Sequence, residues 1–554
     1  MVMTTISYKA FIESLGSELS IDDLRKVLFD MGMELDGFED DDLIVEITPE
    51  RLDLLSAQGL ARAVKLFIGL SDEQPQFIAQ KENMYQVNVD KQVEEVRPFT
   101  VCAVVKNINF SDENLKQIIN IQEKLHQTLA RRRSRGAIGI YPLEKISWPI
   151  RYTAGTPDSF SFIPLGETRS MTGKEILEFH ETGKEYAHLL KDKNLYPYFI
   201  DSNNEILSMP PIINSEKTGR VSSETNGVFI ECSGFELNLL NQLLMHLTTM
   251  FSDMGGEIYS VNVNYENNVL LTPDFSPKEK NLDITKIKNL IGIELSENQI
   301  ETFLKKSSFE IVEKKGFNWL IRIPPYRYDV WHEVDIVDDI ARAFGYNNIP
   351  MKIPNVFSIG STLPISKLTE ELSDVMVGLG FLETYTFAIT SKKEQLENML
   401  IEEDKVGFME IANGMESQGM IRISLIPQQL QALANNRNRP LPQKIFEGSF
   451  VVVPDSSKDV KSRNEMHFTA LITDKIVTFT DIRQSLDALL LTKGIKVDVV
   501  PTVHPSFIKG RSGTIIYKGE SIGIIGELNP QVLENFGLQA PVGVFEINIE
   551  KLLF

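Results

Sequence analysis

The chain contains two copies of one small module, and this duplication constrains its fold more than any other feature. Without a gap, residues 16–53 align with residues 292–329 at ten identical positions. Both segments end in the pattern P-x-R-x-D, completed by Asp53 in the first copy and Asp329 in the second. Both then reach Ala-Arg-Ala, four residues later in the second copy, and four residues are about one helical turn. Each copy is therefore predicted to be an α+β module in which a helix and two strands precede the motif and another helix follows it.

The second copy differs from the first in the residues that follow the motif. Two prolines and then apolar residues at helical spacing predict a helix that begins near Trp331. Asp335, Asp338 and Asp339 fall together on the opposite side of that helix, with Arg342 within reach of the last two. These carboxylates are either a solvated acidic face or oxygen ligands for a hard cation such as Mg²⁺. The first copy lacks them, so the module does not need them to fold.

Composition limits the remaining possibilities. A length of 554 residues predicts three or four domains, and the chain shows neither an apolar run long enough to span a membrane nor a signal peptide. Cys102 and Cys232 are too few for a disulfide framework or a zinc site, which indicates a cytoplasmic protein. The net charge of −21 argues against holding nucleic acid by bulk electrostatics, so any such contact must be local.

Linkers rich in proline and charge divide the chain into four expected domains. They are residues 1–90, the first module; residues 91–270, a central α/β domain; residues 271–350, the repeated module with the acidic helix; and residues 351–554, a final domain. The predicted fold class is therefore α+β multidomain with a duplicated small module. Within the central domain, residues 112–133 are expected to form one long amphipathic helix that ends in arginines.

Several stretches resemble one known family. The segment PPYRYDVWHEVDIVDDIARAFGYNNIP is similar to the signature of the β subunit of phenylalanyl-tRNA synthetase. IQEKLHQTLARRRSRGAIGIYPL and LSMPPIINSEKTG resemble the editing domain of that family, and IRISLIPQQLQALANN and IGELNP resemble its C-terminal domain. An inserted tRNA-binding barrel and a C-terminal anticodon-binding domain are both missing. The resemblance is therefore to the shorter archaeal and eukaryotic-cytosolic type.

The resemblance implies one subunit of a heterotetramer with two α and two β chains. Phenylalanine would be attached to tRNA(Phe) on the α subunit, which would bind ATP and phenylalanine, and no catalytic residue is assigned to this chain. The C-terminal domain is expected to be a degenerate class II synthetase-like antiparallel sheet with helices, because it lacks the G-x-G-x-G-x-x-R motif that holds ATP. Its Gly523 and Gly526 are predicted to form a tight turn.

The family also implies a role for the acidic residues of the second module. Asp329, Asp335, Asp338 and Asp339 stand at the spacing of the residues that hold Mg²⁺ at the contact with α. The family more often has glutamate at the last two positions, so the shorter aspartates would bind through water or more weakly. One alternative to the family function is an independent magnesium-dependent enzyme centred on this cluster.

The central domain is expected to hydrolyse mischarged Tyr-tRNA(Phe). An apolar pocket rejects an added hydroxyl only weakly, so discriminating phenylalanine from tyrosine needs a second site lined with hydrogen-bonding groups. By resemblance, the residues that border this pocket are Ser208, Pro211, Asn214 and Ser215, although serine and asparagine beside prolines are also common turn residues. No Ser-His-Asp or Cys-His arrangement is visible, so hydrolysis would depend on a positioned water. The second alternative is a scaffold subunit that no longer edits.

One basic run provides a local contact for tRNA. Arg131, Arg132, Arg133 and Arg135 follow the predicted long helix. Cations at the carboxyl end of a helix stabilise it, which explains part of the run. Four arginines within five positions exceed that need, and a contact with the phosphates of the tRNA acceptor arm is the hypothesis for the rest.

Overall fold

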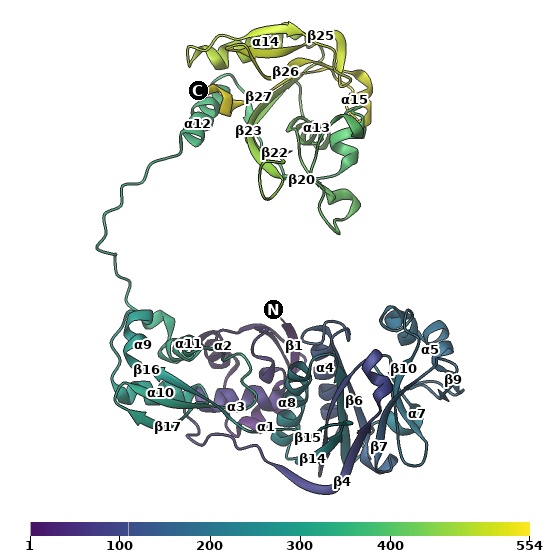
Figure 1. Cartoon of the computed structure of the whole chain (residues 1–554). Coiled ribbons are helices and arrows are strands. Elements are labelled where there is room, and N and C mark those ends of the chain that lie inside the picture. Colours follow the sequence, from purple (N-terminus) through teal and green to yellow (C-terminus); the bar gives the residue numbers. More distant parts are fainter. Residues whose placement is uncertain (1, 109, 554) are drawn as a thin grey trace. The chain divides into compact units, whose positions relative to one another are not determined.

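The computed structural model describes residues 2–108 and 110–553, and the chain forms two compact units (Figure 1). The first unit is Met1–Ile353 and the second is Pro354–Phe554. Each unit is described by itself. No helix in the described part of the chain is long and apolar enough to cross a membrane.

The two copies of the repeated module have the same order of elements. The first contains β1 (Val2–Ser7), α1 (Tyr8–Leu15), α2 (Ile21–Asp30), β2 (Glu34–Glu39), β3 (Asp42–Ile47) and α3 (Ala57–Phe67). The second contains β16 (Lys278–Asp283), α9 (Ile284–Ile291), α10 (Glu297–Lys306), β17 (Glu310–Lys315), β18 (Asn318–Ile323) and α11 (Glu333–Phe344). Both sheets are antiparallel, ordered β1-β3-β2 and β16-β18-β17. Each module therefore has one strand and one helix more than the sequence pattern predicted.

Two of the positions that are identical in the two copies lie at equivalent helix ends. Gly16 and Gly292 end α1 and α9 in the left-handed conformation, with φ of 71° and 81°, which glycine adopts without steric cost. Ser20 and Ser296 precede α2 and α10, and each side chain accepts a hydrogen bond from a backbone N–H in the first turn. These two shared positions are thus start and stop signals of the module's helices.

A ten-stranded mixed sheet forms the centre of the first unit. Its order is β12-β11-β10-β7-β4-β14-β5-β13-β6, with β15 also paired to β14. The strands are β4 (Ala79–Val89), β5 (Phe99–Lys106), β6 (Gly136–Pro142), β7 (Ile150–Gly155), β10 (Tyr196–Ile200), β11 (Ile206–Met209), β12 (Ile213–Asn214), β13 (Gly227–Gly234), β14 (Glu257–Asn264) and β15 (Val269–Thr272). A separate two-stranded sheet pairs β8 (Ser161–Phe162) with β9 (Met171–Thr172).

Helices cover this sheet, and its apolar core continues into the first module. The helices are α4 (Asp112–Gln127), α5 (Gly173–Phe179), α6 (Glu181–Tyr186), α7 (Glu216–Gly219) and α8 (Leu237–Asp253). One cluster of buried side chains joins Phe11 and Leu28 of the first module to Val101 and Leu243 of the central part. The strand β4 pairs with β14 and β7 and so belongs to the central sheet. The central part therefore begins before residue 91, where the boundary was predicted.

The long helix predicted over residues 112–133 is shorter in the structure. Helix α4 ends at Gln127, and the chain then turns through three residues in the left-handed region, Arg131, Arg132 and Arg133, with φ between 46° and 63°. Non-glycine residues rarely adopt this conformation, so the turn is held by its surroundings. The amphipathic pattern continued past the last helical turn because Leu129 and Ala130 still pack against the core.

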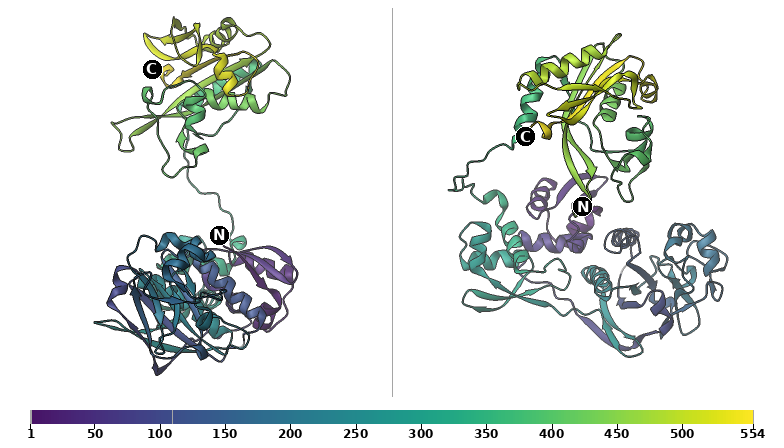
Figure 2. Two further views of the ribbon diagram at one scale, coloured as in Figure 1. Left: turned by 90° about the vertical axis from the view of Figure 1, so that its right-hand side faces the viewer. Right: turned by 45° about the horizontal axis from the view of Figure 1, so that its top comes forward.

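The second unit is a seven-stranded sheet with helices on both faces (Figure 2). Its order is β19 (Leu382–Glu383), β22 (Gln443–Pro454), β23 (Ser462–Thr473), β27 (Val542–Asn548), β26 (Glu520–Leu528), β25 (Phe507–Tyr517) and β24 (Asp498–Pro501), antiparallel except for β19 against β22. One core contains residues of α12 (Pro364–Gly378) and α14 (Phe479–Leu491), and another contains residues of α13 (Ile426–Asn435) and α15 (Pro530–Asn535). A short pair, β20 (Ile389–Thr390) and β21 (Met420–Ile421), lies outside the main sheet.

Gly523 and Gly526 do not form the predicted tight turn. Both lie within β26, where a Cβ on Gly523 would stand 2.1 Å from the Glu546 carbonyl oxygen of the adjacent strand. Glycine is therefore required here because two strands approach closely.

Candidate functional sites

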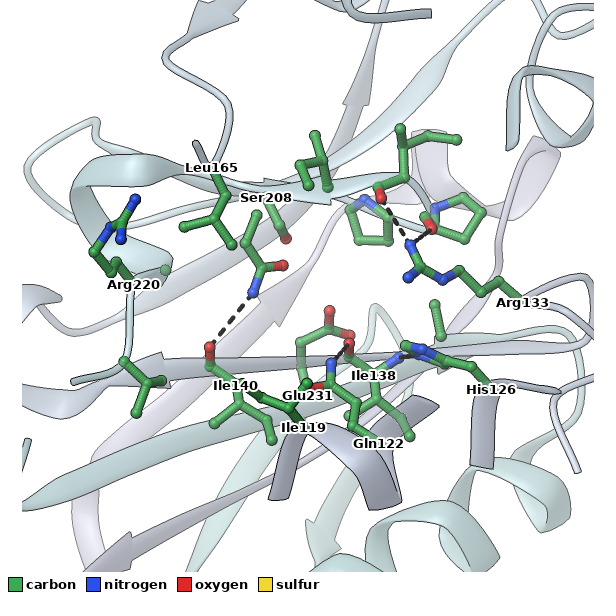
Figure 3. A pocket seen from close by; sticks show the side chains of 18 of the residues that line it. Ile119, Gln122, His126, Arg133, Ile138, Ile140, Leu165, Ser208, Arg220 and Glu231 are labelled. Atoms are coloured by element: carbon green, nitrogen blue, oxygen red, sulfur yellow. Dashed lines mark hydrogen bonds between the residues drawn. The ribbon is translucent and has the colours of Figure 1, made fainter. Parts of the chain in front are cut away.

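A cavity of about 480 Å³ opens on the central sheet (Figure 3). Its walls come from α4, from β6 and from the segment that joins β11 to β12. Most of the lining is apolar, and includes Leu115, Ile118, Ile119, Ala137, Ile138, Ile140, Leu165, Pro210, Ile212 and Ile213. A mostly apolar cavity of this size with a few polar groups fits a small ligand or the end of a larger one.

The polar part of the cavity centres on Glu231 of β13. Glu231 is only 1% exposed, and burial raises the pKa of its carboxyl group to about 8. The Tyr141 hydroxyl lies 2.6 Å from Ser208 Oγ and 3.2 Å from Glu231 Oε1 and hydrogen-bonds to both. Within the described residues, Glu231 Oε2 has no hydrogen-bond partner. A buried oxygen in this state is costly, and Glu231 is one of the residues that line the cavity.

Gly139 leaves the room that this network occupies. A Cβ at Gly139 would stand 2.2 Å from the Tyr141 hydroxyl oxygen and 2.6 Å from Glu231 Oε1. Any larger residue at this position of β6 would displace both polar groups.

A second set of contacts braces the wall formed by α4 and the turn after it. The Ile138 N–H donates to Nε2 of the buried His126 at 2.9 Å, and burial lowers the pKa of that imidazole. The Arg133 guanidinium donates to the Ile212 carbonyl oxygen at 2.9 Å and lies over the Tyr186 ring. Because Nε2 is already used, His126 is not free to act as a base on a ligand through that atom. Both side chains position the cavity wall.

The structure brings three of the four predicted pocket residues together. Ser208, Pro211 and Asn214 line the cavity, and Asn214 Nδ2 donates to the Ile140 carbonyl oxygen at 3.4 Å. Ser215 is buried next to it but is not among the lining residues, and its N–H donates to the Leu207 carbonyl oxygen. Sequence reasoning missed Glu231, although a lone acidic residue within the otherwise apolar strand GVFIECSG was a signal, because burying it costs free energy without a partner.

The four arginines of the basic run divide into two pairs. Arg133 is bound to backbone oxygens at the cavity, and Arg135 forms a two-fold hydrogen bond with the Glu236 carboxylate at 2.9 Å. Arg131 and Arg132 are exposed, and their guanidinium groups make no ion pair or hydrogen bond with any residue that the structure describes. Arg131 and Arg132 are thus the two arginines of the run whose guanidinium groups have no partner among the described residues.

The four acidic residues proposed for Mg²⁺ are held by other partners. Arg327, which is 3% exposed, donates from Nη2 to Asp329 Oδ2 at 2.7 Å and to Asp339 Oδ2 at 2.5 Å. Burial opposes its charge, yet Asp339 and Asp329 hold the pKa of Arg327 well above its ordinary value. Asp335 accepts the backbone N–H groups of Trp331 and His332, both at 2.7 Å, and so caps α11.

The remaining acid follows the solvated-face interpretation. Asp338 pairs with Arg342 at 2.9 Å, as the helical spacing indicated, and also accepts a hydrogen bond from the Tyr346 hydroxyl. Across residues 2–108 and 110–553, no three acidic, histidine or cysteine side chains are grouped so that they could hold a metal ion. The four aspartates therefore do not fit a Mg²⁺ site within this chain.

The same arginine–aspartate pair occurs in the first copy. Arg51 donates to Asp53 at 2.9 and 3.0 Å, and Arg62 lies 3.8 Å from the same carboxylate. Burial alone would raise the pKa of Asp53, but the Arg51 guanidinium lowers it to about 2. The P-x-R-x-D motif is thus a buried ion pair in both modules. Residues of the two modules, among them Arg51 and Asp339, line one small cavity.

The family models identify the class of protein that this fold represents. The model described as phenylalanyl tRNA synthetase beta chain CLM domain matches residues 349–549, and the tRNA synthetase B5 domain matches residues 280–346. The second copy of the repeated module and the second unit are therefore similar to domains of aminoacyl-tRNA synthetase subunits.

Whole-chain relatives make the assignment specific. The chain is 38% identical to the phenylalanine–tRNA ligase β subunit of Pyrococcus furiosus over 543 residues, 97% of each chain, and 34% identical to that of Methanocella arvoryzae over the full length of both. A crystal structure of an N-terminal fragment of the phenylalanyl-tRNA synthetase β subunit from Pyrococcus horikoshii matches with a TM-score of 0.60 and 36% identity, covering 62% of this chain and 99% of the fragment. The chain belongs to the phenylalanine–tRNA ligase β-subunit family.

This confirms the family and the enzyme class that the sequence predicted. The chain is a component of phenylalanine–tRNA ligase, a class II aminoacyl-tRNA synthetase, and as a β subunit it works with an α subunit and tRNA. The relatives named here are archaeal, in agreement with the predicted type.

Proposed function

We propose that the cavity on the central sheet hydrolyses mischarged Tyr-tRNA(Phe), while the α subunit charges tRNA with phenylalanine. The single observation that carries this proposal is the unpartnered Oε2 of Glu231 in a mostly apolar cavity. A tyrosine hydroxyl would satisfy that oxygen, whereas a phenylalanine side chain would leave it buried and unpaired. Sites built to bind a hydroxyl reject the analogue that lacks it far more strongly than apolar pockets reject an added hydroxyl.

Protonation supports the same assignment. With its pKa near 8, Glu231 is mainly neutral at pH 7 and can donate one hydrogen bond while accepting another. The Tyr141 hydroxyl donates to Glu231 Oε1, so Oε2 is the carboxyl oxygen left for the ligand. No side chain at the cavity is arranged as a nucleophile with its base among the described residues, so hydrolysis would use water.

Replacement of Asn214 tests the placement of the cavity. Asn214→Ala removes a polar group at the cavity wall and should slow deacylation of Tyr-tRNA(Phe) by the complex with α about 10-fold, the effect of one lost hydrogen bond. Synthesis of Phe-tRNA by the same complex should stay within two-fold of the parent.

The matched control for this test is Asn267→Ala, which changes an exposed turn residue between β14 and β15. It should leave both reactions unchanged. Equal losses of deacylation and charging in Asn214→Ala would show a folding defect instead, and an unchanged deacylation rate would place the site elsewhere.

We further propose that Arg131 and Arg132 contact the phosphates of the tRNA acceptor arm. The left-handed turn anchored by Arg133 holds both side chains in solvent beside the cavity. Arg133 and Arg135 have partners within the chain, so we assign them a structural role.

Salt dependence is the measurement for this contact. Arg132→Ala should weaken tRNA binding by the complex and lower the slope of log K against log salt concentration by about one. Arg169→Ala, which also changes an exposed arginine of the first unit, should leave the slope unchanged. Equal slopes for the parent and Arg132→Ala would contradict the proposed contact between Arg132 and tRNA phosphates.

We propose the family's assembly of two α and two β chains in the cytoplasm, with ATP and phenylalanine bound by α. The absence of the G-x-G-x-G-x-x-R motif from the whole sequence supports assigning ATP to the partner. The close strand packing at Gly523 shows that the one glycine pair in this region serves the sheet instead.

For the acidic helix we infer that Arg327 and Arg342 neutralise Asp329, Asp338 and Asp339, and that Asp335 caps α11, in place of the Mg²⁺ site that the resemblance implied. The test uses the parent chain and a triple variant, both without α; the variant carries Asp335→Asn, Asp338→Asn and Asp339→Asn. In each protein, adding Mg²⁺ should leave the melting temperature unchanged. Binding to the folded state alone would raise the melting temperature, so the shift reports the site. A melting temperature that rises with Mg²⁺ in the parent but not in the variant would contradict this inference. It would support a Mg²⁺ site at Asp329, Asp335, Asp338 and Asp339.

A further inference from the structure

The central part of the first unit contains a buried arginine that the site described above does not use. Arg97 lies two residues before β5 and is 3% exposed. Among the described residues its guanidinium group forms no ion pair and donates only to neutral oxygens. These are Ser233 Oγ at 3.3 Å and the carbonyl oxygens of Ser233 at 2.7 Å and Arg133 at 3.4 Å. Because a buried cation without a carboxylate partner is costly, its presence here calls for a physical reason.

A buried acid lies beside this arginine. Glu231 and Ser233 are two residues apart on β13, which pairs with β5 and β6 in regular register, so their side chains lie on the same face of the sheet. The contact between Arg97 and Ser233 therefore brings the guanidinium group to the neighbourhood of Glu231. Glu231 accepts from the Tyr141 hydroxyl and forms no ion pair with any residue that the structure describes. Two opposite charges are thus buried near one another without a direct contact.

The electrostatic effects between the two groups agree with this placement. Burial raises the pKa of Glu231 to about 8, and the charge of Arg97 opposes that rise. Burial lowers the pKa of Arg97, and Tyr152 and Glu231 oppose that fall. The other titratable groups near Glu231 stay neutral up to about pH 9, because burial raises the pKa of each; they are Tyr141, Tyr152, Cys102 and Cys232.

We propose that Arg97 is a positioning residue that acts on substrate recognition through Glu231. It holds the part of β13 that carries Glu231, and it supplies the fixed positive charge next to the carboxyl group that receives the hydroxyl of a mischarged tyrosine. A hydroxyl that donates to Glu231 Oε2 favours negative charge on the carboxyl, and a nearby cation stabilises that charge. The role in recognition rests on the proposed deacylation by the cavity, whereas the coupling of Arg97 to Glu231 is a property of the chain alone.

Arg97 also braces the wall of the cavity, and this second effect must be separated from its charge. Its Nη2 donates to the Arg133 carbonyl oxygen, and the Arg133 side chain donates to the Ile212 carbonyl oxygen at the cavity wall. Arg97→Lys and Arg97→Gln both lose part of this bracing, because neither side chain has the five donors of a guanidinium group. Only lysine keeps the charge. Comparison of the two variants therefore separates the charge from the hydrogen bonds.

Urea unfolding of the chain without α, followed by a signal from the first unit, measures the coupling. In the parent, the contribution of Glu231 to the free energy of unfolding falls as pH rises toward its pKa of about 8. Arg97→Gln removes the opposing charge, so this fall should continue to higher pH. The destabilisation caused by Arg97→Gln should therefore be larger at pH 9 than at pH 6. Arg97→Lys should keep the pH dependence of the parent.

The Glu231→Gln background is the control for charge. There, Arg97→Gln should destabilise the chain equally at pH 6 and pH 9, because no carboxyl group is left to titrate. Equal destabilisation at the two pH values with Glu231 present would overturn the proposal. Failure of Arg97→Gln to fold in both backgrounds would also overturn it, because Arg97 would then act only on the fold. Folding restored by Glu231→Gln would support the coupling.

Deacylation by the complex with α tests the role in recognition. Arg97→Gln should slow deacylation of Tyr-tRNA(Phe) about 10-fold, the effect of weakening one hydrogen bond to the substrate, and Arg97→Lys should slow it less. In the Glu231→Gln background the effect of Arg97→Gln should be clearly smaller. Arg151→Gln changes a half-exposed arginine of β7 that is paired with Asp90, and it should leave deacylation unchanged.

The two measurements distinguish failure of this inference from failure of the proposed function. An equal loss of deacylation for Arg97→Gln in both backgrounds would overturn the inference, because the effect would not pass through Glu231. A parent complex that does not deacylate Tyr-tRNA(Phe) would overturn the proposed function and with it the role in recognition. The unfolding experiment would then still decide whether Arg97 is coupled to Glu231.

Discussion

Glu231→Ala should lower the rate of Tyr-tRNA(Phe) deacylation by the complex with α about 10- to 100-fold. This is the loss expected when one buried hydrogen bond between Glu231 and the ligand is removed. Deacylation of Phe-tRNA should not fall, because phenylalanine makes no bond to Glu231. Charging by α should be nearly unchanged, since the cavity lies in the first unit of the β chain and the ATP motif is not in this chain.

The isosteric variant Glu231→Gln is the matched control. Its amide can donate to one oxygen and accept from another, as the protonated carboxyl does, so it should retain most of the activity. Equal losses in Glu231→Gln and Glu231→Ala would indicate that a negative charge is required. Unchanged discrimination between Tyr-tRNA and Phe-tRNA in Glu231→Ala would contradict the assignment.

The raised pKa of Glu231 makes the stability of the folded chain depend on pH. Between about 4.5 and about 8 the carboxyl keeps its proton in the folded chain and loses it in the unfolded chain. The folded state then binds more protons, so the free energy of unfolding from this group falls as pH rises through that range. Glu231→Gln should remove this fall. The comparison of parent and variant by urea unfolding at pH 5 and pH 8 measures it.

Arg327→Met should have the largest effect on stability. Among the described contacts, Arg327 is the only cation bound to Asp339. Its removal leaves the carboxylates of Asp329 and Asp339 buried close together without a positive charge between them. Removing one partner of a buried ion pair costs about 3–5 kcal/mol of the free energy of unfolding. Urea unfolding of the chain, followed by a signal from the first unit, measures this loss.

Two further variants make the prediction specific. Arg322→Met removes a half-exposed arginine of the same module, paired to Glu279 and Glu310, and should cost at most about 1 kcal/mol. Adding Asp329→Asn and Asp339→Asn to Arg327→Met removes the uncompensated charges and should restore part of the loss. Similar losses for Arg327→Met and Arg322→Met would contradict the account of the motif.

The duplicated module was the part of the fold that the sequence predicted best. The identical residues Gly16 and Gly292, and Ser20 and Ser296, act locally as helix ends, and local signals can be recognised without knowing the rest of the structure. The boundaries near residue 90 and residue 133 were wrong because they depend on distant partners. Strand β4 pairs with β14 and β7, which both lie far from it in the sequence, and α4 stops where the chain must turn into β6.

The candidate sites show the same limit. Ser208, Pro211 and Asn214 were predicted from a resemblance carried by one short motif, whereas Glu231 lies on β13 and Tyr141 and Gly139 lie on β6, and only the sheet register brings these strands together. For the acidic helix, the carboxylates alone left a solvated face and a metal site open, and the family resemblance implied Mg²⁺. Arg327 belongs to the motif itself, but its hydrogen bond to Asp339 could be seen only in the structure.

The most direct test of the central claim, that this chain supports and edits but does not charge, is aminoacylation by the purified components. The chain alone, with ATP, phenylalanine and tRNA(Phe), should form no Phe-tRNA above background. Addition of the cognate α subunit should produce charging, and the same complex should deacylate Tyr-tRNA(Phe). Formation of Phe-tRNA by the purified chain without α would contradict the account.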